Sequence, residues 1–155
     1  MANQNILSAN FSHLQVVDEQ LVWLGALAEK YFTDDPNTSL IKMRQFGELL
    51  AKHVATQMGL YNTEKEESQY ELLRRLRDEG ALPFQTYQLF GEIRRVGNTA
   101  SHAIQGDKAT ALNILKMGWQ LGVWFQQTFI KTDFKAGEFI PPAATSETAA
   151  LQEER

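Results

Sequence analysis

Apolar residues recur at the helical period along most of this 155-residue chain, and no stretch of useful length alternates apolar and polar residues as a strand does. Repeats of this kind give each helix one apolar face, which must pack against another element to be buried. With short loops between the helices, the pattern predicts an all-α fold, an antiparallel bundle of four to five helices. The chain is long enough for one domain with a substantial core and too short for two of ordinary size.

Capping residues and helix breakers set the expected limits of these helices. Asp18 is a suitable N-cap for the first, and turn residues follow it at 33–37. Gly59 and Gly80 are stop signals, Pro83 suits the first turn of the fourth helix, and Asp107 can cap the fifth. The predicted helices cover 18–32, 38–61, 68–79, a segment from Pro83 into the cluster described below, and 108–131.

Composition divides the chain into three parts. Residues 1–17 are expected to form an N-terminal arm and residues 18–140 the bundle, with 134–140 lying against it as a non-helical strap. Residues 141–155 begin with Pro141 and Pro142 and end in a charged, alanine-rich stretch, which predicts a linker and the start of a further helix. Such an end is typical of a piece cut from a longer protein; an ordinary ragged C-terminus is the alternative.

Several site classes are excluded by composition. Cysteine is absent, so there can be no disulfide and no thiolate metal ligand. His13, His53 and His102 are too scattered to predict a metal site, and no cofactor is expected in this segment. The N-terminus lacks the pattern of a secretory signal, and no apolar run is long enough to cross a bilayer. A cytoplasmic location with no membrane partner is therefore predicted.

Net charge argues against a protein that coats nucleic acid. The chain carries −4, of which −3 lies in residues 133–155 and −1 in the preceding 132. Binding through many phosphate contacts needs a basic balance. Any nucleic-acid contact must be local, and its source would be Arg94 and Arg95. A group at Arg74, Arg75 and Arg77, mixed with acidic residues, is better interpreted as a solvated helix face.

One cluster stands out as a candidate site, near the expected C-terminal end of the fourth helix. Arg94, Asn98 and His102 are spaced by four and share a helical face, and Arg95 flanks it. Arginine suits phosphate and developing negative charge, and histidine can transfer a proton near neutral pH. These four residues are predicted to bind nucleic acid or a partner.

The same cluster also has a structural interpretation. Gly97 and Asn98 would mark a bend or a close approach of two helices. Arg94 and His102 would then hold neighbouring helices through carboxylates such as Glu48 or Glu92.

Two catalytic arrangements are missing from the sequence. There is no phosphate-binding Gly-x-x-x-x-Gly-Lys-Ser/Thr segment, so this segment alone should not hydrolyse ATP. There is also no convincing Asp…Glu-x-Lys nuclease arrangement.

Five blocks occur in order at 24–32, 35–38, 42–50, 94–102 and 121–125. Together they resemble the N-terminal helical domain of unknown function in type I restriction enzyme R subunits and related helicases, over about residues 10–132. The resemblance implies an accessory, non-catalytic domain of a parent protein that couples ATP hydrolysis to DNA translocation and cleavage. Its expected partners are other restriction-enzyme subunits or domains and nucleic acid, with a homodimer as a further expectation.

That domain is similar in turn to the HEPN superfamily, whose active ribonucleases carry Arg-x4–6-His. Arg95 and His102 are separated by six residues and fit this motif. The resemblance therefore implies an alternative function, a metal-independent ribonuclease with Arg95 and His102 as catalysts. In it the RNA 2′-hydroxyl would attack its own phosphate while His102 transfers a proton. Whether this domain is itself an enzyme stays open at this point.

Overall fold

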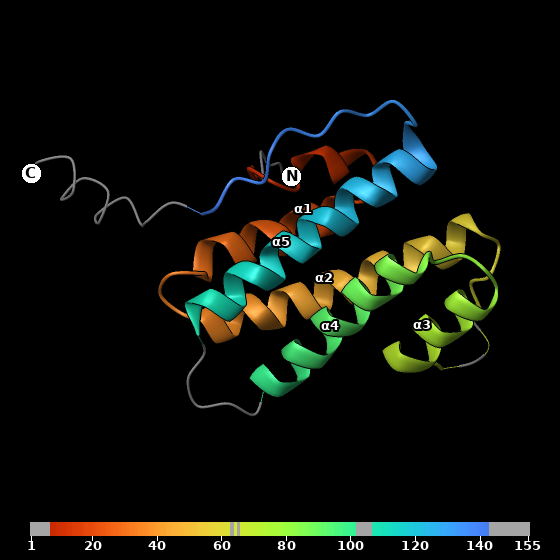
Figure 1. Ribbon diagram of the computed structural model, residues 1–155, viewed down its shortest axis with the longest axis horizontal. Coiled ribbons are helices and arrows are strands. Elements are labelled where there is room, and N and C mark those ends of the chain that lie inside the picture. Colours follow the sequence, from red (N-terminus) through yellow and green to blue (C-terminus); the bar gives the residue numbers. More distant parts are fainter. Residues whose placement is uncertain (1–6, 63, 65, 102–106, 143–155) are drawn as a thin grey trace, which may run out of the picture.

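The computed structural model describes residues 7–62, 64, 66–101 and 107–142, and within these ranges all regular structure is helical (Figure 1). The predicted all-α bundle is confirmed. The elements, in chain order, are η1 (Ser12–Val16), α1 (Glu19–Tyr31), α2 (Pro36–Gln57), α3 (Gln69–Asp78), α4 (Phe84–Ala100), α5 (Lys108–Phe125) and the π-helical turn η2 (Gln126–Ile130).

Local chemistry explains where most helices begin. The Asp18 carboxylate accepts a hydrogen bond from the backbone of Gln20 at 2.9 Å, as predicted for the N-cap of α1. Asp35 caps α2 in the same way, accepting from Thr38 N at 3.2 Å. The predicted start at residue 38 was wrong because Pro36 occupies the first turn, where its missing N–H costs nothing.

The predicted ends of α2 and α5 were also too late. Gly59 and Gly80 take left-handed conformations, with φ of 69° and 78°, and each follows a helix end. The α-helix of α2 therefore closes at Gln57 rather than residue 61. At the end of α5 the backbone changes at Gln126 to a π-helical turn, η2, which extends the helical segment to Ile130.

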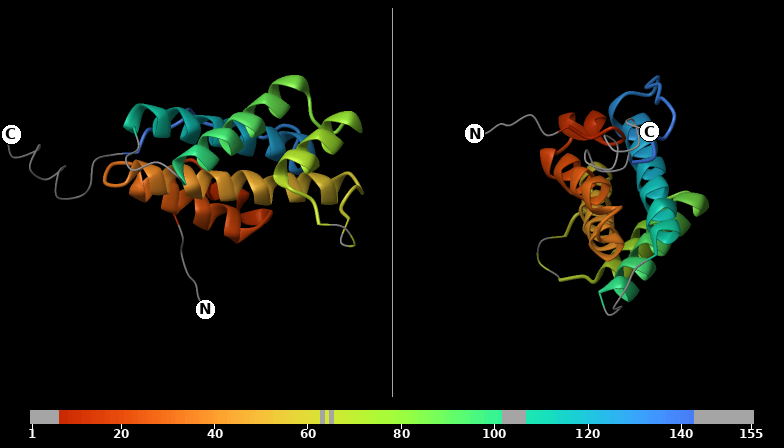
Figure 2. Two further views of the ribbon diagram at one scale, coloured as in Figure 1. Left: turned by 90° about the horizontal axis from the view of Figure 1, so that it is seen from below. Right: turned by 90° about the vertical axis from the view of Figure 1, so that its left-hand side faces the viewer.

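Helix α2 is the centre of the bundle, with α1, α4 and α5 packed along it and α3 packed against α4 at one end (Figures 1 and 2). Helix α1 runs antiparallel to α2. At one end the Ser39 hydroxyl donates to the carbonyl of Ala28 at 2.7 Å, and at the other His53 Nε2 lies 2.8 Å from Asp18 Oδ2. Among the described helices, none is both long and apolar enough to traverse a bilayer.

The segment before α1 enters the core. Phe11 and Leu14 are fully buried, although they belong to the part predicted as an arm. The ring of Phe11 lies 5.0 Å from that of Phe46 on α2 and is in direct contact with Gly25 on α1. Leu14 reaches α5 at Gly122. The N-terminal segment thus fills the space between α1, α2 and α5.

Residues after η2 run back over the bundle as an extended strap, drawn in blue in Figure 1. The buried side-chain amide of Asn10 accepts from Ile140 N and donates to Ile140 O, both at 2.8 Å. The same amide donates to Glu29 on α1 at 2.8 Å, and burial raises the pKa of that carboxyl. One asparagine therefore joins the strap to α1.

We predict that Gly25→Ala destabilises the protein by about 1–3 kcal/mol, because the added methyl group would overlap the ring of Phe11. The matched control is Gly91→Ala in α4, where an added Cβ meets nothing within 4 Å. That change should stabilise by about 0.5–1 kcal/mol through helix propensity alone. Urea unfolding monitored by circular dichroism measures both, and equal effects would contradict the packing described for Phe11.

A second prediction concerns His13, whose ring lies 4.9 Å from that of Phe134 in the strap. Burial lowers the pKa of His13 below its ordinary value of 6.5. The unfolded chain therefore takes up a proton before the folded one, so the free energy of unfolding should fall as pH drops below about 6.5. Between pH 7.5 and 5 the melting temperature of His13→Asn should depend less steeply on pH than that of the wild type. Parallel profiles for the two proteins would show that His13 does not cause the loss of stability at low pH.

Candidate functional site

The described members of the predicted cluster lie on the C-terminal half of α4, which crosses α2 at Gly97. Gly97 is buried at this crossing, and a Cβ there would lie 2.5 Å from Arg44 Cβ and 3.2 Å from the carbonyl oxygen of Leu40. The two backbones can approach this closely only because residue 97 has no side chain. Of the two structural roles expected for Gly97, the close helix approach is confirmed.

Asn98 uses its side chain across this crossing. Its Oδ1 accepts a hydrogen bond from Arg44 Nη1 at 3.3 Å, and its carbonyl accepts from the Ser101 hydroxyl at 2.7 Å. Arg44 was missed as a member of the site. It is 54 positions from Asn98, and no spacing rule within one helix could bring the two together.

The adjacent arginines point to different partners. Arg95 is exposed and donates two hydrogen bonds to Glu92, at 3.1 and 2.6 Å. Hydrogen bonding to Glu92 raises the pKa of Arg95. Arg94 instead reaches α3, where its guanidinium carbon lies 5.3 Å from the centre of the Tyr70 ring. Among the described residues, no side-chain hydrogen bond or ion pair joins any two of Arg94, Arg95 and Asn98.

His102, the fourth member of the predicted cluster, lies outside the described residues. The expected shared face of Arg94, Asn98 and His102 therefore stays a prediction. What the structure places at the crossing is Arg44, Gly97 and Asn98.

The expected ion pairs of the structural interpretation are formed by other arginines. Glu48 lies 3.7 Å from Arg44, and Glu92 pairs with Arg95. Arg94 has no ion pair with a described carboxylate, contrary to that expectation. Its Nε atom is buried and has no hydrogen-bond acceptor in the described part of the chain.

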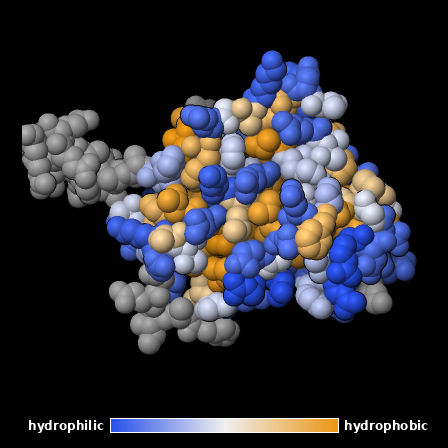
Figure 3. All heavy atoms as spheres, in the orientation of Figure 1, coloured by the Kyte–Doolittle hydropathy of each residue, from blue (hydrophilic) through white to orange (hydrophobic). Residues whose placement is uncertain are grey.

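The arginines of α3 were predicted to form a solvated helix face, and two of the three pair with carboxylates there. Arg75 donates two hydrogen bonds to Glu67 at 2.7 and 2.8 Å, and Arg77 pairs with Asp78 at 2.9 Å. Hydrophilic residues gather over this part of the surface, at the lower right of Figure 3. Arg74 is different, because its guanidinium carbon lies over the Tyr70 ring, at 5.7 Å from the centroid.

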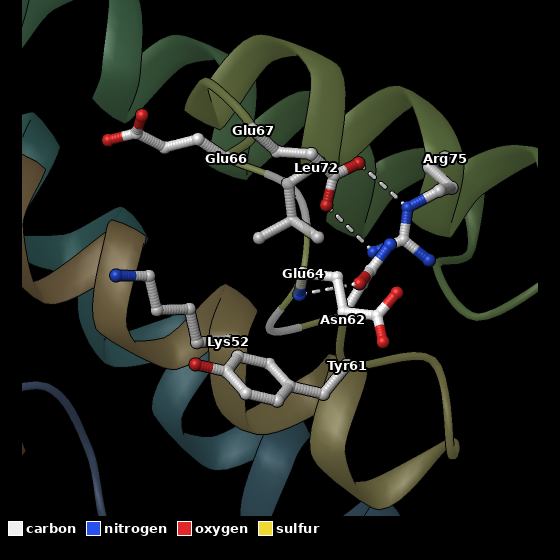
Figure 4. Close-up of a pocket in the computed structure, with 8 residues that line it drawn as sticks. All are labelled: Lys52, Tyr61, Asn62, Glu64, Glu66, Glu67, Leu72 and Arg75. Atoms are coloured by element: carbon white, nitrogen blue, oxygen red, sulfur yellow. Dashed lines mark hydrogen bonds and ion pairs between the residues drawn. The ribbon is translucent and has the colours of Figure 1, made fainter.

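A hollow of about 460 Å³ opens between the end of α2 and α3 (Figure 4). Its wall includes Lys52, Tyr61 and Leu72, with the Glu67 carboxylate turned toward Arg75. This hollow could not be predicted from the sequence, since its residues are spread over a helix, a loop and a second helix. Within the described residues, no group of three or more histidine and acidic side chains could hold a metal ion.

Comparison with known proteins shows that this chain is similar to part of a restriction enzyme subunit. The chain is 36% identical over 135 residues to the Type I restriction enzyme EcoKI endonuclease subunit of Escherichia coli (strain K12). The aligned segment covers 86% of this chain but 11% of that protein, so the chain spans about a tenth of the relative's length. No protein-family model matches the chain, and no solved structure matches it. The predicted resemblance to restriction-enzyme endonuclease subunits is confirmed to this extent.

The helix crossing makes a third prediction. Gly97→Ala should cost about 1–3 kcal/mol, because the new methyl group must displace Arg44 and the α2 backbone at Leu40. Arg95→Ala should leave stability unchanged within error, because its ion pair with Glu92 is exposed. Chemical denaturation of the two variants distinguishes a packed crossing from a loose one, for which Gly97→Ala would be tolerated.

Proposed function

We propose that this chain is an accessory helical domain of a type I restriction enzyme endonuclease subunit, and that it binds other parts of such an enzyme rather than cutting nucleic acid. The observation that supports this most is the extent of the similarity, which covers 86% of the chain and 11% of the relative. A compact bundle of this size corresponds to one domain of a much longer protein.

The sequence supports a non-cleaving role. It holds neither a phosphate-binding Gly-x-x-x-x-Gly-Lys-Ser/Thr segment nor an Asp…Glu-x-Lys arrangement. Motor and nuclease chemistry would therefore come from other segments of a restriction enzyme. The surface that we propose for binding is the C-terminal half of α4, with Arg94, Arg95 and Asn98. His102, which lies outside the described residues, is part of the same proposal.

The geometry of the described members fits binding better than catalysis. An arginine that stabilises a phosphorane must direct its donors at the reacting phosphate. In this structure Arg95, one of the two residues required by the ribonuclease alternative, directs two donors at Glu92. A HEPN-like identity for the bundle is part of the same proposal and implies ancestry rather than activity.

The fourth prediction tests binding directly. The purified chain, mixed with separately purified subunits of a type I restriction enzyme from the same organism, should co-elute with one of them in size-exclusion chromatography. Asn98→Ala, which removes the side-chain acceptor for Arg44, should weaken that complex severalfold, whereas Glu64→Gln in the α2–α3 loop should not. If the chain binds none of the subunits, the docking role is rejected.

The ribonuclease alternative is tested on the same preparation. The chain is incubated with single-stranded RNA in EDTA, and wild type is compared with His102→Ala and Arg95→Ala. We expect the three proteins to give the same background. Cleavage by the wild type that both substitutions abolish would replace the binding proposal with an enzymatic one.

A further inference from the structure

The six arginines that the structure describes fall into two groups. Four of them form an ion pair with a carboxylate at 3.7 Å or less: Arg44 with Glu48, Arg75 with Glu67, Arg77 with Asp78 and Arg95 with Glu92. Within the described part of the chain, Arg74 and Arg94 form none. Both contact the same aromatic ring, that of Tyr70.

This shared contact brings two separate elements together. Tyr70 and Arg74 lie one turn apart on α3, and Arg94 comes from α4. The guanidinium carbons are 5.7 and 5.3 Å from the ring centroid, within the range of a cation–π interaction. Tyr70 is 49% exposed and Arg74 is exposed, whereas Arg94 is half-buried with its Nε atom buried, so only its terminal Nη groups can reach a ligand.

A guanidinium that contacts an aromatic ring keeps chemistry that an ion-paired one has lost. The ring has no lone pairs to accept the N–H donors as a carboxylate does, so the planar fork remains available for an anion. The fork fits phosphate oxygens with two parallel hydrogen bonds. Arg74 and Arg94 are thus the arginines of the described surface best able to take an external phosphate.

We propose that Arg74 and Arg94, held by Tyr70, form a binding site for the phosphodiester backbone of a nucleic acid. The inference rests on the proposed function in placing this chain within a restriction enzyme. Arg94 belongs to both proposed surfaces, whereas Tyr70 and Arg74 lie outside the surface proposed for docking, so Arg74→Gln is the variant that separates the two proposals. A hollow of about 370 Å³ lies beside this site, with Tyr70 and Arg74 in its lining and Arg94 outside it.

Acidic residues around the hollow limit the affinity of this site but do not block it. Glu67 and Asp78 are each bound to an arginine, and Glu71 accepts from Ser68 N in the capping box of α3. The Glu79 carboxylate, also in the hollow, interacts electrostatically with Arg75 and forms no ion pair within 4 Å among the described residues. Removing its charge should strengthen phosphate binding.

The fifth prediction is a set of binding measurements on the intact 155-residue chain. Fluorescence anisotropy with labelled duplex DNA, single-stranded DNA and single-stranded RNA at several salt concentrations should show salt-dependent binding to at least one probe. Arg74→Gln and Arg94→Gln should each weaken it about threefold to tenfold and reduce the salt slope by about one. The probe bound most tightly identifies the nucleic acid.

Controls separate this site from diffuse attraction. Lys116→Gln removes the same charge from an exposed position on α5 and should change affinity by less than twofold. Tyr70→Phe should keep binding while Tyr70→Ala weakens it, because only the ring is needed to hold the arginines. Glu79→Gln should tighten binding.

Two results would overturn the proposal: no binding of any probe by the wild type, or equal losses for Arg74→Gln and Lys116→Gln. Circular dichroism verifies that each variant is folded. Co-elution with enzyme subunits is measured separately, so loss of nucleic-acid binding with docking intact rejects this site alone. Loss of docking with nucleic-acid binding intact rejects only the proposed function.

Discussion

The insertion of Phe11 between three helices is the contact on which the rest of the bundle depends. Its ring is fully buried against Phe46 on α2 and fits because residue 25 on α1 is glycine. With Leu14 directed at Gly122, this segment closes the side of the bundle between α1 and α5. Dense packing of this kind tolerates little change in volume. The strap depends on it too, because Asn10, the neighbour of Phe11, holds Ile140.

Helix α2 connects the packing around Phe11 to the candidate site on α4. The middle of its buried face contacts Phe11 through Phe46, while Gly47 meets Ile93 and the Arg44 side chain meets Gly97 on α4. The position of α4 is therefore fixed at two successive turns by close contact. Fixing α4 also fixes Arg94, whose side chain reaches Tyr70 on the helix that α4 supports. Packing at the N-terminus and the arrangement of surface arginines thus belong to one continuous framework.

Periodicity and capping were enough to predict the all-α class and most helix limits, because both are set by neighbours within a few residues. Asp18 and Gly80 are examples in which one residue determines an end. The role of Phe11 could not be predicted. It precedes η1, a 3-10 helix of five residues, and so short a segment has no amphipathic repeat that would reveal a buried face. At the site, Gly97 was correctly associated with a close approach. Its partner Arg44 could not be, because that contact depends on how two helices cross.

The different environments of Arg94 and Arg95 show why sequence proximity was a weak guide to chemistry. Successive residues on a helix point about 100° apart, so one arginine faces its own helix and solvent while the next faces α3. A carboxylate three residues before Arg95 satisfies its charge, whereas Arg94 meets an aromatic ring. The ring orders the side chain without occupying its donors, which lowers the conformational entropy lost when an anion binds. A pair of arginines held in this way can contribute to affinity on a domain whose net charge is negative, provided that binding is confined to that one place.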